Sequence, residues 1–492
     1  KDGKPVAGGR EAWRLFASHY HVFAGTPSKT WVDHSLKASF GIDEELSAAT
    51  ADAIYDRIDA ALATPALLPR AVLDSANVEV IATTEFALDT LPHHQKMKAD
   101  GYIGRVRTTY RPDDVTDPSR PAIAANLHKF GELAGEDISS WAGLINAHRN
   151  RRAYFREFGA VATDHGVPTA NTADLPLAEK QALLDRVLAN KHTPEDAELF
   201  RAQMLTEMAL LAVEDGMVMQ IHAGSRRNTD PLLMAERGPD LGADIPGTTD
   251  YVNGLRALLS RCGNEPNLRL IMFVLDETTY ARELAPLAGY WPCLRLGPPW
   301  WFHDSPNGMR RYLDEVFETA GAANLAGFND DTRALLSIPA RHDVWRRMVA
   351  GFAARMVAEH RLSQTTATEL TAWLSHGAAR AGIDGKIEQR QIEAGWQLPC
   401  PNGLPVTGAI DAGDLGPPQL LHRTLGQGPP GRDLPPAGQG LAGNAQIGGA
   451  PGIGGMIGVA AFLRQHSVEA DVEAGSSQGI LLLRRALPQA PG

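Results

Sequence analysis

The stretch TPEDAELFRAQMLTEMALLAVEDGMVMQIH, residues 193–222, encodes a helix followed at once by a buried strand. Thr193 can cap the helix, with Pro194 in its first turn and Asp196 in the capping-box position. Gly216 marks the helix end, and the short, nearly apolar run after it is typical of a strand covered on both faces. An apolar stripe recurs at helical spacing at Phe200, Met204, Met208 and Leu211.

The same alternation of helix and strand continues on both sides of this stretch. Short runs rich in Val, Ile or Leu predict seven strands, at Val78–Thr83, Gly104–Thr109, Gly159–Thr163, Met217–His222, Leu268–Leu275, Pro292–Leu296 and Asn324–Phe328. Strands that alternate with helices predict a parallel sheet. A closed parallel barrel needs eight strands, whereas an open doubly wound sheet can hold seven, so the number alone leaves both folds open.

Polar residues recur where the predicted strands end. They are Thr83-Thr84-Glu85, Tyr110-Arg111-Pro112-Asp113, Asp164-His165, His222, Asp276-Glu277 and Asp330-Asp331. Barrel enzymes carry their chemistry at the C-terminal ends of their strands. The recurrence therefore favours an α/β fold of the (β/α)₈ TIM-barrel type over the open sheet.

Two regions flank the predicted barrel at residues 76–383. Residues 1–75 predict a helical segment that packs on the barrel, and their clearest helix, Ala48–Ala63, has one apolar face made by Ile54, Tyr55, Ile58 and Leu62. Residues 384–492 are rich in Gly and Pro, with 25 such residues between positions 401 and 460. We expect this tail to be disordered or non-native, because it has no clear hydrophobic periodicity.

The composition argues against several classes of protein. The formal net charge of −11 and the pI near 5.8 argue against nucleic acid or an anionic membrane as the partner. Three cysteines without a CxxC pair argue against a disulfide framework and a thiolate zinc site. No apolar run approaches the roughly 18–20 residues of a membrane helix. An acidic balance is the commonest state of a soluble cytoplasmic enzyme, so it selects no function by itself. We expect a cytoplasmic location, and a homo-oligomer stays open.

Two residues at strand ends could bind a metal or move a proton. Asp331 follows the last predicted strand, where a carboxylate can ligate a divalent cation and exchange a proton with substrate. The alternative is that Asp330 or Asp331 caps the next helix. His222 ends an apolar strand, where a histidine is more often a hydrogen-bonded core residue than a ligand. Arg226 and Arg227 follow it, and an arginine fork suits a carboxylate, although a solvated basic loop is the alternative for Arg226.

Other aromatic and histidine residues give weaker signals. Trp300-Trp301-Phe302 could fill the core, or could wall an active site against solvent and stack on a sugar ring. Asp164-His165 is a weaker candidate, because Asp164 can equally cap a helix. His19-Tyr20-His21 has the His-x-His form of a barrel metal pair, but its context predicts a helix, where residues two apart point about 200° apart. We therefore expect no metal site at this pair.

Dispersed segments between Arg10 and about Arg361 match one known family in its order. They are Gly25-Thr26-Pro27-Ser28, Ala82-Thr83-Thr84-Glu85, Tyr110-Arg111-Pro112-Asp113, Met219-Gln220-Ile221-His222 with Arg227-Asn228, Trp300-Trp301-Phe302-His303-Asp304, Gly327-Phe328-Asn329-Asp330-Asp331-Thr332-Arg333, Leu336-Ser337 and Arg341-His342. The chain resembles the uronate (glucuronate) isomerase family, a branch of the amidohydrolase superfamily. The resemblance implies a (β/α)₈ barrel that interconverts D-glucuronate with D-fructuronate, and D-galacturonate with D-tagaturonate.

The resemblance also implies roles for individual residues and a cofactor. Asp331 matches the metal-ligating aspartate that can take part in proton transfer, and His222 lies close to the metal. Arg333 holds substrate oxygens near Asp331. The side chains expected to contact the sugar acid are Arg227, Trp301 and Arg111. The implied substrate is a hexuronate, and the implied cofactor is a divalent metal, with zinc as the family-based expectation.

Two family features do not occur in the 492 residues. The family carries a His-x-His metal pair on its first strand and, soon after it, an Asp-His-Tyr segment that supplies a catalytic tyrosine. We expect that the chain begins downstream of both, so that the barrel lacks its first strand, exposes strand edges and binds metal weakly. Expressed alone, this polypeptide is expected to be inactive or poorly folded. The alternatives are a metal-dependent hydrolase of the same superfamily and a non-catalytic remnant.

Overall fold

Residues 9–384 are described by a computed structural model, except residues 103, 121, 240–243, 299–302, 329 and 332–333. Side chains are described as far as residue 381. The tail predicted at 384–492 lies outside the described residues, apart from the backbone of its first residue. In the described ranges, no helix is both long enough and apolar enough to cross a membrane.

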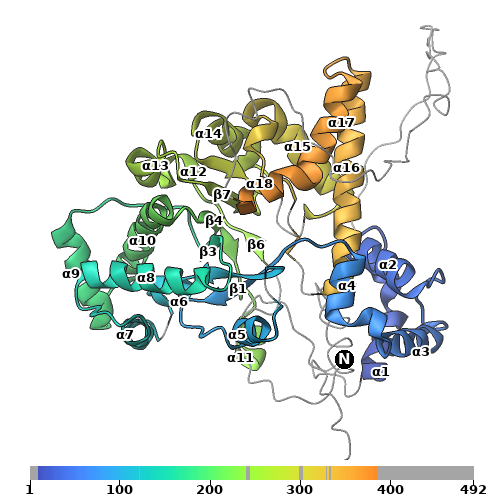
Figure 1. The fold of residues 1–492 in the computed structure, drawn as a ribbon, viewed down its shortest axis with the longest axis horizontal. Coiled ribbons are helices and arrows are strands. Elements are labelled where there is room, and N and C mark those ends of the chain that lie inside the picture. Colours follow the sequence, from blue (N-terminus) through green and yellow to red (C-terminus); the bar gives the residue numbers. More distant parts are fainter. Residues whose placement is uncertain are drawn as a thin grey trace, which may run out of the picture. The chain divides into compact units, whose positions relative to one another are not determined.

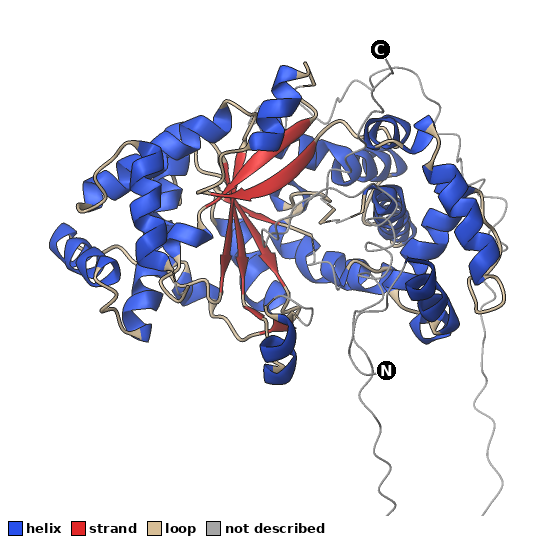
Figure 2. Ribbon diagram, turned by 90° about the horizontal axis from the view of Figure 1, so that it is seen from below, coloured by secondary structure: helices blue, strands red, loops and turns tan. Residues whose placement is uncertain are grey.

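A six-stranded parallel sheet lies among the helices (Figure 2). Its strands, in spatial order, are β1 (Ile81–Phe86), β2 (Val106–Arg111), β3 (Ala162–Val167), β4 (Val218–Ala223), β7 (Leu270–Val274) and β8 (Leu294–Leu296). Two short strands, β5 (Ser225–Arg226) and β6 (Ile245–Pro246), pair antiparallel with each other. Helices connect the strands of the main sheet, as parallel strands require. The parallel sheet predicted from the alternation is confirmed.

Fourteen α-helices of the described residues lie between the strands of the sheet or after its last strand. They are α5 (Pro92–Ala99), α6 (Asp113–Thr116), α7 (Ile123–Ala134), α8 (Trp141–Arg156), α9 (Leu177–Leu188), α10 (Pro194–Asp215), α11 (Pro231–Arg237), α12 (Tyr251–Gly254), α13 (Arg256–Cys262), α14 (Ala285–Tyr290), α15 (Pro306–Ala320), α16 (Ile338–Ala358), α17 (Gln364–Ala372) and α18 (Ala378–Asp384). In α10 the predicted capping box is present, since Thr193 and Asp196 each accept a hydrogen bond from the other's backbone amide. Gly216 ends α10 with a φ of 74°. Local sequence therefore fixes both ends of this helix.

The (β/α)₈ barrel expected from the sequence, lacking its first strand, is not confirmed. Among the described residues, the seventh predicted strand, Asn324–Phe328, is reduced to one parallel bridge between Leu296 and Leu325. A hydrogen bond of 2.8 Å from the Ala326 amide to the Leu296 carbonyl continues the pairing. Gly327 then takes a φ of 76°, which turns the backbone out of the extended conformation. The structure supports an α/β fold with six parallel strands.

The strands begin one to three residues later than predicted. β3, for example, begins at Ala162 rather than Gly159, because Gly159 takes a φ of 86° in the turn after α8. This shift places Asp164 and His165 inside β3 rather than after it. Because side chains in a strand alternate between its two faces, the correction decides which of them faces the site.

Helices also make up the chain from residue 9 to residue 75. They are α1 (Gly9–Ser18), α2 (Pro27–Phe40), α3 (Ala51–Leu62) and α4 (Pro69–Ser75), with the 3₁₀ turn Tyr20–Phe23 between α1 and α2. Their own apolar cluster includes Ile54, Tyr55 and Ile58, three residues of the face predicted for α3. Helix α2 contacts α16 and the 3₁₀ turn Leu335–Ser337 that precedes α16. In Figure 1, α2 lies beside one end of α16. This segment therefore reaches the region around Asp331.

The pair His19 and His21 departs from its predicted geometry. Their rings are stacked with centroids 6.5 Å apart, so the prediction that they point apart is wrong. The reason is that His19 leaves the helical conformation at the end of α1, with φ of −111° and ψ of 7°. Its Nδ1 lies 3.0 Å from the Leu15 carbonyl oxygen, so a local hydrogen bond already engages the ring.

Candidate functional site

Three polar side chains from neighbouring strands meet on one face of the sheet. The register pairs Tyr110 with Thr163, so the next residues, Arg111 at the end of β2 and Asp164 in β3, are neighbours on one face. Asp164 Oδ2 lies 3.2 Å from Arg111 Nη1, and Asp164 Oδ1 lies 2.6 Å from His222 Nδ1 in β4. Asp164 therefore links two candidate residues, in what we call the Arg111–Asp164–His222 chain.

The charges of this chain support one another in a buried setting. Burial opposes the charge of Asp164, but His222 and Arg111 outweigh it and bring the pKa of Asp164 below its ordinary value. Burial also opposes the charge of Arg111, yet Asp113 and Asp164 raise its pKa above the ordinary value. Asp164 is therefore a carboxylate, so the proton between it and His222 belongs on Nδ1 of the ring.

Packing against a second ring fixes His222 in place. The imidazole stacks on Phe273 of β7, with centroids 4.6 Å apart and an angle of 4° between the rings. A histidine that donates from Nδ1 to a carboxylate has Nε2 as its basic nitrogen, which is the arrangement found in many metal sites. The side chain is about one-quarter exposed, at 26%. His222 is thus a hydrogen-bonded residue that can also act as a ligand or base.

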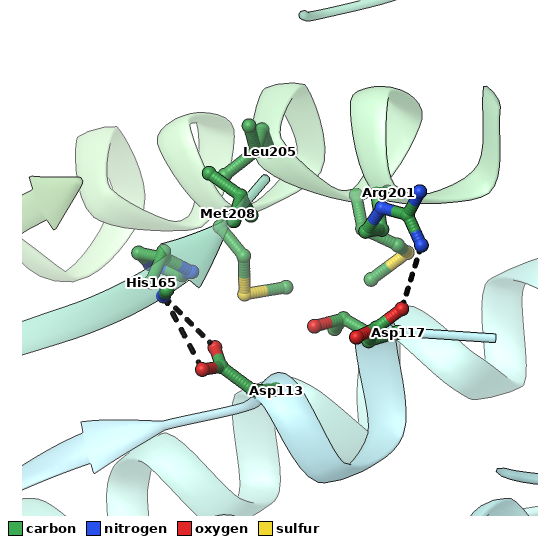
Figure 3. A pocket seen from close by; sticks show the side chains of 10 residues that line it. Asp113, Asp117, His165, Arg201, Leu205 and Met208 are labelled. Atoms are coloured by element: carbon green, nitrogen blue, oxygen red, sulfur yellow. Dashed lines mark hydrogen bonds and ion pairs between the residues drawn. The ribbon is translucent and has the colours of Figure 1, made fainter. Parts of the chain in front are cut away.

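Asp113 binds both Arg111 and the backbone of β3, and so helps to hold the Arg111–Asp164–His222 chain in place. Its carboxylate accepts from Arg111 Nε at 2.7 Å and from the Gly166 amide at 3.2 Å. A Cβ at Gly166 would lie 2.2 Å from Arg111 Nη2, so this position requires glycine for the close approach of the arginine. In Figure 3 the carboxylate of Asp113 points toward β3, and two dashed lines mark its hydrogen-bond contacts with the backbone of that strand.

The opposite face of β3 borders a small pocket next to α10. Figure 3 shows His165, Asp113 and Asp117 around it, with Arg201 of α10 bonded to Asp117 at 2.7 Å. Burial lowers the pKa of His165 to about 3, so its ring is neutral at ordinary pH. Its Nε2 lies 3.0 Å from Thr163 Oγ1. His165 therefore faces the helix layer and belongs to the packing rather than to the charge chain.

The remaining candidates differ in how far the structure places them. Asp331 is exposed, and its charge is near enough to contribute to the raised pKa of Arg111. Arg227 donates from Nε to Asp244 Oδ1 at 2.5 Å, beside the β5–β6 ribbon. Trp301 and Arg333 lie outside the described residues. The structure therefore connects two of the predicted residues, Arg111 and His222, through Asp164, and places Arg227 in a separate ion pair.

Sequence reasoning ranked Asp164 too low and missed Asp113 and Asp244 as partners. Asp164 was a helix-cap candidate because the predicted strand ended at Thr163. Extending that strand by four residues, to Val167, would have put Asp164 inside it and opposite a neighbouring strand. A polar residue inside an otherwise buried strand was the available signal.

Glu85 in β1 is a partly buried carboxyl that pairs in register with Tyr110 of β2. It accepts from Thr108 Oγ1 at 2.5 Å. Burial raises the pKa of Glu85 from 4.5 to about 7. The folded protein therefore holds a proton that the unfolded chain releases, and the resulting stability is present below pH 4.5 and lost as the pH rises through 7.

We expect Glu85→Gln to remove this pH dependence. Relative to wild type, the variant should gain on the order of 2 kcal/mol in free energy of unfolding between pH 4.5 and 7.5, because a neutral amide has no proton to lose. Urea unfolding at several pH values measures it. The control is Glu132→Gln on the exposed side of α7, where a change below about 0.5 kcal/mol is expected. A difference between Glu85→Gln and wild type that stays constant with pH would refute the prediction.

The family model for glucuronate isomerase matches residues 5–374. The chain belongs to the glucuronate isomerase family. A uronate isomerase of Phenylobacterium zucineum (strain HLK1) is 57% identical over 376 residues, covering 76% of this chain and 78% of that protein. This match confirms the resemblance stated from the sequence.

Solved structures of the glucuronate isomerase family resemble the described fold. Glucuronate isomerase from Caulobacter crescentus matches with a TM-score of 0.76 and 52% identity, covering 79% of this chain and 81% of that one. Uronate isomerase from Thermotoga maritima matches with a TM-score of 0.73 and 28% identity, covering 77% and 83%. The chain is therefore an isomerase of this family with the α/β fold of its relatives.

Proposed function

We propose that the chain is a uronate isomerase that interconverts D-glucuronate with D-fructuronate, and D-galacturonate with D-tagaturonate. The observation that carries the proposal is the 57% identity over 376 residues to a uronate isomerase. The Arg111–Asp164–His222 chain supports it through His222, whose Nε2 is left as a basic nitrogen by the bond from Nδ1 to Asp164. We also propose the (β/α)₈ barrel, which the parallel register and the bridge at Leu325 support.

The chemistry needs groups that can move a proton and stabilise charge. Isomerisation of an aldose to a ketose removes a proton from C2 and delivers one to C1 through an enediol. We assign proton transfer to Asp331, since an exposed carboxylate can accept and return a proton. Arg333 is assigned to stabilising the charge on O1 and O2. His222 is assigned to a place close to the metal, as a ligand through its basic Nε2. The residues proposed to hold the sugar acid are Arg111, Arg227 and Trp301.

A divalent metal, with zinc as the expected ion, belongs to this proposal with His222 and Asp331 as ligands. The bond from His222 to Asp164 suits a metal-binding imidazole. Within the described ranges, however, no group of three or more His, Cys, Asp or Glu side chains could hold an ion. Two ligands bind a divalent cation weakly, so the described residues do not by themselves fit the metal, and no step is assigned to it. A cytoplasmic location and a homo-oligomer stay predictions.

An isomerase assay tests the function and the expected lack of activity together. Two forms are compared: the 492-residue chain, and an extended chain that carries the family's His-x-His and Asp-His-Tyr segments upstream of Lys1. With D-glucuronate or D-galacturonate, we expect the extended chain to form ketose and the 492-residue chain to be at least about 100-fold slower, because two ligands, His222 and Asp331, bind a divalent cation weakly.

The outcomes separate the two claims. An extended chain that is folded by circular dichroism and forms no ketose would contradict the proposed function. Near-normal turnover by the 492-residue chain would instead contradict the expected lack of activity. Release of a hydrolysis product without ketose would favour a hydrolase.

A further inference from the structure

A buried arginine lies next to the segment that carries Asp331. Arg341 is in the first turn of α16 and is only 2% exposed. Its Nε donates to Asp304 Oδ2 at 2.6 Å, and Nη1 donates to the backbone carbonyl of Asp331 at 2.7 Å. The same Nη1 also forms an ion pair with Asp330. One guanidinium therefore holds both the Asp330-Asp331 segment and the residue before the N-cap of α15.

The N-terminal helical segment contributes to the same contact. The ring of Trp31 in α2 lies 5.0 Å from the guanidinium of Arg341, within the range of a cation–π interaction. Ser35, one turn further along α2, donates to the Leu336 carbonyl at 3.1 Å. Trp31 is 4% exposed, so this stacking is protected from water. Helix α2 thus contacts Arg341 and the turn that leads into α16.

An arginine side chain can make these contacts at the same time, whereas a lysine side chain cannot. Asp304 and Asp330 are nearly fully buried, and their carboxylates approach different edges of one planar group. The rigid fork of arginine can serve two carboxylates and a carbonyl at once, whereas a lysine ammonium is a single point charge. A backbone carbonyl held at 2.7 Å fixes the peptide of Asp331, while the side chain of Asp331 stays exposed.

We propose that Arg341 is a positioning residue for Asp331, and that Trp31 of α2 holds Arg341 in place. The inference rests on the proposed function, in which the Asp331 carboxylate transfers the proton. Arg341 itself touches no reacting atom. It sets where the carboxylate stands, and a shift of about 1 Å in a catalytic group can slow turnover about 100-fold.

The test uses Arg341→Lys, which keeps the charge and so avoids leaving two buried carboxylates without a cation. In the form that turns over, we expect kcat to fall at least about 10-fold while KM changes less than about 3-fold. In the 492-residue chain, amide exchange in peptides that span residues 330–337 should accelerate about 10-fold, with β3 and β4 unchanged. Trp31→Leu should shift both readouts in the same direction, by about 3-fold.

The control is Arg347→Lys on the same helix. Arg347 donates from Nε to Asp343 Oδ2 at 2.7 Å, but it is 78% exposed, so we expect neither readout to change. Unchanged kcat and local exchange in Arg341→Lys would overturn the proposal. So would equal acceleration of exchange in β3 and β4, which indicates a general loss of stability. If the unsubstituted extended chain forms no ketose, the proposed function fails, while the exchange comparison still decides whether Arg341 holds the segment.

Discussion

Replacing Arg111 by Met is expected to lower the free energy of unfolding by about 3–5 kcal/mol. Arg111 contacts the buried carboxylates of Asp113 and Asp164, at 2.7 Å and 3.2 Å. Without the guanidinium, burial would leave both carboxylates in an environment that opposes their charge. The pKa of Asp113 is already raised by burial with Arg111 present, which shows how strongly this site opposes a carboxylate. Equilibrium unfolding in urea at pH 7.5 measures the change.

An exposed arginine with the same kind of contact is the control for this variant. Arg149 donates to Glu214 from Nε at 2.7 Å and from Nη2 at 2.8 Å, but both side chains are more than 40% exposed. We expect Arg149→Met to lower the free energy of unfolding by less than about 1 kcal/mol. Equal effects of the two substitutions would mean that burial of the carboxylates is not what makes Arg111 important.

Replacing Asp331 by Asn is expected to lower kcat by about 1,000-fold. An amide cannot accept the C2 proton, and it is a poorer ligand for a divalent cation than a carboxylate is. Stability should change by less than about 0.5 kcal/mol, because the side chain is exposed. Kinetics of ketose formation by the extended chain measure the first effect, and the content of bound divalent metal in the same preparations should fall with it.

The control for Asp331 is Asp276, which follows β7. Its carboxylate accepts from the Thr278 amide at 3.0 Å and from Thr278 Oγ1 at 2.7 Å, so a turn rather than the charge chain engages it. We expect Asp276→Asn to keep kcat within about 3-fold of wild type. If Asp331→Asn retains normal kcat, the assignment of proton transfer to this residue is wrong. A loss of bound divalent metal without a loss of turnover would limit Asp331 to metal binding.

Features that depend on neighbouring residues could be predicted from the sequence, whereas features that depend on pairing between distant segments could not. Helix α10 could be predicted in detail, because Thr193, Asp196 and Gly216 act on backbone groups within one turn of themselves. The parallel sheet followed from the alternation of apolar runs with helices. Strand ends were less accurate, and Asn324–Phe328 proved to be a single bridge, because pairing depends on a neighbour distant in sequence.

What the sequence determined by itself was therefore the kind of fold, the ends of its best helix and, through dispersed motifs, the family. Only the tertiary structure decided that Asp164 joins Arg111 to His222. Arg111 lies 53 positions before Asp164 and His222 lies 58 positions after it, and strand register brings the three together. It alone placed Arg341 against Asp331 and brought Trp31 from α2 to the same point. Hydrogen bonds within a turn depend on neighbouring residues and can be predicted from them. The partner of a buried charge depends on how the strands and helices pack.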